Sequence, residues 1–120
     1  MKTELSPGSS VILCSTDLML ISSVSGAAEF CGFQFVSVNS VQTAIENSST
    51  PRCIVCLDLS ASFSDPAAFA AVAPPELLAR SIAFGPHVHT ARLDAARAAG
   101  IGRVMSRGQF VSGLGTHFTD

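Results

Sequence analysis

The sequence predicts an α/β fold in which a doubly wound, five-stranded parallel sheet carries helices on both faces. Short apolar runs alternate with stretches of helical periodicity about five times along the chain. The apolar runs are continuous, as expected for strands covered on both faces. The chain has 120 residues, of which 48% are hydrophobic and 13% charged, and this is enough for one buried core.

The predicted strands are the apolar runs themselves. They cover residues 11–14, 33–38, 53–59, 81–84 and 103–106. The run at 53–59 is the most apolar, and Asp58 is its only charge. We therefore expect this strand at the centre of the sheet.

The predicted helices begin at capping side chains and end near glycine or proline. Residues 15–17 and 39–40 supply N-cap side chains for the first two helices, and Asp65 followed by Pro66 opens the third. Beyond the prolines at 74–75 we expect a turn at 76–80, a helix opened by His89 or Thr90 and closed by Gly100, and a short last helix at 109–114.

Composition narrows the classes of function. A formal net charge of −2 with only 7 Lys and Arg residues argues against a nucleic-acid groove. No apolar run reaches the ~18 residues of a membrane span, and the first residues lack the apolar stretch of a signal peptide. The dinucleotide and serine-hydrolase motifs are also absent from the sequence. We expect a single cytoplasmic domain at residues 10–120 after a tail at 1–9, with no nucleic acid or membrane as partner.

The cysteines are expected to be buried free thiols. All 4 lie in apolar stretches, whereas a disulfide-stapled domain usually places them among polar loops. Cys53 and Cys56 have C-x-x-C spacing but fall within a predicted strand. Positions i and i+3 of a strand point to opposite faces, so these two thiols are expected in the core rather than at a metal or redox site.

Candidate functional residues are those that follow the strands, because ligands of such sheets bind at the carboxyl ends of the strands. Asp58 is the most prominent of them. A carboxylate that ends an apolar strand must be solvated, hydrogen-bonded or paired. It is either a phosphoryl acceptor or metal ligand, or a carboxylate that holds its own loop, and the residues alone leave both interpretations open.

Residues 11–114 resemble the receiver domain of response regulators. Asp58 falls at the phosphoryl-accepting aspartate of that family, residues 106–108 fall at its Thr-Lys-Pro segment, and the alanine-rich stretch 95–100 resembles the helix before its fifth strand. The resemblance implies a flavodoxin-like three-layer sandwich with strand order 2-1-3-4-5. It also implies a role in a bacterial-type two-component phosphorelay.

The departures from the family concern its chemistry. Receivers bind Mg²⁺ with an acidic pair that here is replaced by Ser15 and Thr16, with Asp17 one residue later. Gly85 falls near the switch hydroxyl, and Arg107 stands at the lysine of the family. An ion pair between Asp58 and Arg107 is the expected substitute for the lost site.

Two functions follow from this resemblance. The first is a non-catalytic pseudo-receiver, without a cofactor, that acts through a protein partner or as a homodimer. Its expected contact surface is the helix at 90–100, the fifth strand and the last segment. The alternative is a phosphorylatable receiver with Asp58 as acceptor and an unusual Mg²⁺ site.

A weaker alternative is a small-ligand or metal pocket. In an extended segment His87 and His89 point the same way, so both rings can reach one ion, with Asp17 or Asp58 as a third ligand. The competing interpretation is that His89 caps the next helix and His87 lines the loop. His87 is also a candidate for a pH-sensitive gate.

Overall fold

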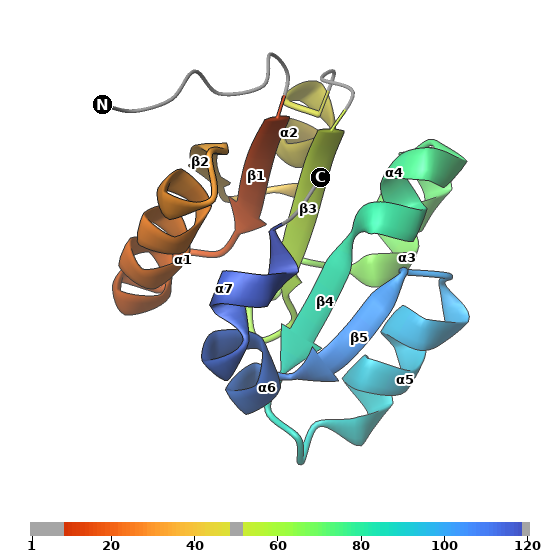
Figure 1. Ribbon diagram of the computed structural model, residues 1–120. Helices are drawn as coiled ribbons and strands as arrows, with labels where there is room; N and C mark the ends of the chain where they lie inside the picture. Colours follow the sequence, from red (N-terminus) through yellow and green to blue (C-terminus); the bar gives the residue numbers. More distant parts are fainter. Residues whose placement is uncertain (1–8, 49–51, 119–120) are drawn as a thin grey trace.

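A five-stranded, all-parallel sheet organises the chain in the computed structural model, which describes residues 9–48 and 52–118 (Figure 1). The strand order is β2-β1-β3-β4-β5, as the sequence predicts and as a flavodoxin-like fold requires. The strands are β1 (Ser9–Cys14), β2 (Gln34–Val38), β3 (Arg52–Asp58), β4 (Ile82–Gly85) and β5 (Arg103–Ser106).

Helices cover both faces of the sheet and enclose two separate hydrophobic clusters. One face carries α1 (Leu18–Phe30), α6 (Arg107–Ser112) and α7 (Leu114–His117). The other carries α2 (Val41–Glu46), α3 (Pro66–Val72), α4 (Pro75–Arg80) and α5 (Thr90–Ala98). No helix in the described ranges is long and apolar enough to cross a membrane.

Strand β1 illustrates why the apolar runs are continuous. Val11 and Leu13 belong to the cluster under α1, whereas Ile12 and Cys14 belong to the cluster on the opposite face. Side chains of a strand alternate between the two faces, and here both faces are covered. An alternating polar pattern would therefore have placed polar groups in one of the two cores.

The N-caps form where the sequence predicts them. The side chains of Asp17, Ser40 and Asp65 each accept a hydrogen bond from a backbone amide in the first turn of α1, α2 and α3. Gly32 ends α1 with a φ of 85°, a conformation that glycine adopts without strain.

Apart from shifts of one residue at the ends of β2, β3 and β4, three boundaries differ from the prediction. The tail was expected to reach residue 9, but Ser9 is a buried residue of β1 whose register partner is Arg52, and residues 1–8 lie outside the described part. The turn expected at 76–80 is the helix α4, which starts at Pro75. The last helix starts at Arg107 instead of Gln109 and is followed by the short helix α7.

Candidate functional site

Asp58 is the centre of the candidate site, at the carboxyl end of the central strand β3. Its side chain is only 3% exposed. The Ser15 hydroxyl donates to its Oδ2 at 2.7 Å, and the backbone amide of Ser60 donates to its Oδ1 at 3.0 Å. Each oxygen of the buried carboxylate therefore has a donor, which is what burial of such a group demands.

Ser15 links this carboxylate to the start of α1. The residue directly follows β1, and its backbone amide donates to the Val38 carbonyl of β2 at 3.1 Å. Its hydroxyl oxygen accepts from the Asp17 amide at 3.1 Å while its proton points to Asp58. Ser15 and Asp58 are 43 residues apart in the chain and meet because β1 and β3 are neighbours in the sheet.

Arg107 pairs with Asp17 and not with Asp58, so the expected Asp58–Arg107 ion pair is wrong. Its Nη2 lies 2.7 Å from Asp17 Oδ2, and both side chains are partly exposed. The Arg107 hydrogen bond, followed by the Leu20 amide, holds the pKa of the Asp17 carboxyl below its usual range. The reason for the exchange is that Asp58 already has two donors from the loops after β1 and β3, whereas Asp17 faces solvent at the N-terminus of α1.

A small cavity of about 280 Å³ opens beside these groups. It is lined by Thr16, Asp17, Asp58, Ser60, Ala61 and Arg107. The structure thus brings together four residues of the predicted site: Thr16, Asp17, Asp58 and Arg107. Ser15 does not line the cavity, but its hydroxyl is hydrogen-bonded to Asp58. In this cavity each oxygen of the Asp58 carboxylate accepts one hydrogen bond, and Asp17 and Arg107 form an ion pair beside it.

Gly85 lies outside this cavity, which is a difference from the predicted pocket. It is buried at the end of β4, where a Cβ would lie 3.2 Å from Leu59 Cβ. A bulkier residue at this position would require Leu59 to move. Glycine here permits close approach of the two strand ends, and it carries no hydroxyl that could face Asp58.

His87 and His89 do not line the Asp58 cavity either. Both are exposed in the turn between β4 and α5. His89 occupies the N-cap position of α5, as the competing interpretation expects, and its carbonyl accepts from the Leu93 amide, but its side chain forms no capping hydrogen bond. Across residues 9–48 and 52–118, no group of three or more His, Cys, Asp or Glu side chains is arranged to hold a metal ion.

The cysteines are free thiols packed among apolar side chains, and three are buried while Cys31 is half-buried. Cys53 and Cys56 belong to the hydrophobic clusters on opposite faces of the sheet, as the strand geometry predicts. Burial raises the pKa of the Cys14 and Cys56 thiols. A protonated thiol is a poor nucleophile and metal ligand, so the raised pKa of Cys56 argues against a redox site at Cys53 and Cys56.

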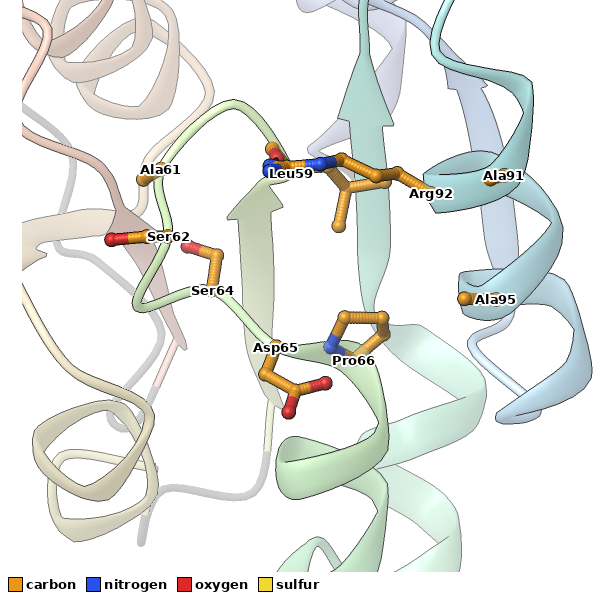
Figure 2. Close-up of a pocket in the computed structure, with 9 residues that line it drawn as sticks. All are labelled: Leu59, Ala61, Ser62, Ser64, Asp65, Pro66, Ala91, Arg92 and Ala95. Carbon is orange, nitrogen blue, oxygen red and sulfur yellow. Dashed lines mark hydrogen bonds between the residues drawn. The ribbon is translucent and has the colours of Figure 1, made fainter.

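A second cleft, which the sequence did not predict, lies between the loop after β3 and helix α5 (Figure 2). Its volume is about 360 Å³, and it carries one basic and one acidic side chain, Arg92 and Asp65. Arg92 donates a hydrogen bond to the carbonyl oxygen of Leu59. In the sequence, Arg92 is one of several charged residues of a helix, and no motif marks it. Only the fold places it over the loop that follows β3.

Comparison with known proteins leaves the family open. No protein-family model matches the chain, and no curated protein matches it either.

Proposed function

We propose that this chain is a non-catalytic pseudo-receiver that acts by binding a protein partner. The observation that carries the proposal is the hydrogen bond between the Ser15 hydroxyl and the buried Asp58 carboxylate. In the family that the sequence resembles, an acidic metal ligand falls at this position. Here a neutral hydroxyl satisfies the aspartate within the protein, so the carboxylate needs no cation to be stable.

The surroundings of Asp58 do not fit a Mg²⁺ ion. Magnesium takes oxygen ligands in near-octahedral geometry, with one or two carboxylates among them. The Asp58 oxygens already accept from Ser15 and Ser60, and the Asp17 carboxylate is held by Arg107. A Mg²⁺ ion at this place would compete with the Ser15 and Ser60 donors for Asp58 and would lie beside the positive charge of Arg107. The proposed function therefore includes no phosphoryl transfer through a metal.

Incubation of the protein with a small phosphoryl donor tests whether Asp58 has lost the ability to accept a phosphoryl group. We expect incubation with acetyl phosphate and Mg²⁺ to leave the intact mass unchanged. Asp58→Asn and Asp65→Asn form a matched pair, since Asp65 caps α3 outside the Asp58 cavity. A phosphorylated species that disappears in Asp58→Asn and persists in Asp65→Asn would overturn the proposal in favour of a working receiver.

The partner surface that we propose consists of α5, β5 and α6. β5 is the edge strand after β4, so one of its sides is not paired within the sheet. Val111 is 42% exposed on α6, the helix that directly follows β5. A cytoplasmic location fits this role and fits the free thiols.

Site-specific photo-cross-linking in cells tests this surface. A photoreactive residue at position 111 is expected to give a discrete cross-linked species. The control is position 30 at the end of α1, where Phe30 is 90% exposed and the helix packs on β1 and β2, on the far side of the sheet from β5. Adducts of equal yield at both positions, or none at position 111, would contradict the proposed surface, and a species of twice the mass would identify a homodimer.

A further inference from the structure

The cleft between the β3–α3 loop and α5 has the dimensions and walls of a small-molecule site. Its volume of about 360 Å³ falls in the range of ligand pockets. Leu59 and Pro66 form an apolar wall, and Ala91 and Ala95 face them from α5 (Figure 2). Alanine at both helix positions leaves room that a longer side chain would fill.

The basic group of the cleft is held in place by the protein. Arg92 donates one hydrogen bond from Nη1 to the carbonyl oxygen of Leu59. A guanidinium carries five N–H donors, so this contact leaves others for a ligand. Within the described ranges Arg92 forms no ion pair, and its charge is therefore not neutralised by a neighbouring carboxylate.

The acidic group of the cleft is held in the same way. Asp65 is the N-cap of α3, and its Oδ1 accepts from the Ala67 amide at 3.0 Å. This contact fixes the side chain and leaves the second oxygen available. Asp65 and Arg92 lie at opposite ends of the cleft in Figure 2, and they do not form a salt bridge with each other.

We propose that this cleft binds a small zwitterionic amino acid. The carboxylate of the ligand pairs with Arg92, its ammonium group pairs with Asp65, and its carbon chain lies against the apolar wall. Two fixed, opposite and unpaired charges across an apolar floor are complementary to such a molecule. A ligand with a single charge would leave either Arg92 or Asp65 without a partner of opposite charge. The inference does not rest on the proposed function, because Asp65 and Arg92 lie outside the Asp58 cavity.

NMR titration of the full chain with defined probes tests the site. The probes are glycine, L-alanine, β-alanine and γ-aminobutyrate, which differ in the separation of their charges, with acetate and methylamine as single-charge controls. We expect saturable shifts of the amides at 61–67 and 91–95 for at least one zwitterion, with a Kd of about 1 mM for so small a ligand. The single-charge controls should bind at least about tenfold more weakly.

Variants decide whether the two charges carry the binding. Asp65→Asn keeps a competent N-cap and Arg92→Gln removes the guanidinium, and each should weaken binding about tenfold. Arg97→Gln is the matched control, because Arg97 pairs with Asp94 on the exposed side of the same helix at 2.9 Å. No saturable shift with any zwitterion, binding that survives both variants, or equal binding of acetate or methylamine would overturn the proposal.

Discussion

At the residue scale, the contacts of His117 determine its protonation state, although no sequence motif marks this residue. Its Nε2 lies 3.1 Å from the Phe110 carbonyl oxygen, and its Nδ1 faces Nη1 of Arg103 at 3.4 Å. Since a carbonyl only accepts and a guanidinium only donates, the ring is a neutral imidazole with its proton on Nε2. It also stacks on Phe110, with ring centroids 5.4 Å apart.

The stability of the protein is expected to fall as the pH drops below about 6.5, the value of an unperturbed histidine. Burial, and then the positive charge of Arg103, lower the pKa of His117. The unfolded chain therefore binds a proton at a higher pH than the folded one, and stability is lost between the two pKa values as acid is added. Urea unfolding at a series of pH values measures this slope.

The control for this pH dependence is a pair of histidine variants. His117→Gln should flatten the slope below pH 6.5, whereas His87→Gln, at an exposed position, should leave it unchanged. The assignment to His117 would be refuted by a slope that is the same in the wild type and in His117→Gln.

At the element scale, the predicted helix starts are confirmed where they depend on capping residues close in the sequence. The N-caps of α1, α2 and α3 were read correctly, because capping joins a side chain to an amide in the next turn. The adjacent prolines 74–75 indicate the end of a helix. Proline is also favoured in the first turn of a helix, and α4 starts at Pro75. Ser106 and Gln109 form a capping box that starts α6 earlier than expected.

Two glycines with opposite surroundings give an element-scale prediction. A Cβ on Gly102 would lie 1.9 Å from the Ala79 carbonyl oxygen, so Gly102→Ala forces α4 and the start of β5 apart. This substitution is expected to destabilise the protein by about 1–3 kcal/mol. Gly26 in α1 has open space around it, and Gly26→Ala should stabilise by about 0.5–1 kcal/mol.

Urea unfolding of both variants at pH 7.5, above the titration range of His117, measures the two effects. Opposite changes in the free energy of unfolding are expected from the same chemical substitution. A Gly102→Ala variant as stable as the wild type would show that α4 can move away from β5 at little cost.

At the scale of the whole molecule, the sheet separates two cores, and α6 and α7 close one of them. Phe84 of β4 stacks on Phe110 of α6, with ring centroids 4.0 Å apart and an interplanar angle of 2°. Phe110 and Leu114 are buried in the same cluster as α1. The last helices therefore belong to the folding unit and are not an appendage.

Removal of the Phe110 ring is expected to destabilise the whole domain, and not only its last helices. Phe110→Ala should lower the free energy of unfolding by about 3–5 kcal/mol, because it leaves a cavity beside Phe84 and His117. Val111→Ala, at the exposed neighbour, should change it by no more than about 0.5 kcal/mol. Hydrogen exchange of β1 amides measures how far the effect spreads, and unchanged protection there would contradict a single cooperative unit.

The sequence by itself determined the α/β class, the strands and the main helices, because periodicity and capping act over a few neighbouring residues. Only the tertiary structure decided the side-chain partners: Ser15 with Asp58 across 43 residues, and Arg107 with Asp17 across 90. The same holds for the cleft that Arg92 and Asp65 share. A hydrogen bond requires its atoms to lie within a few tenths of an ångström of the ideal distance, and only the packing of helices on the sheet sets such distances.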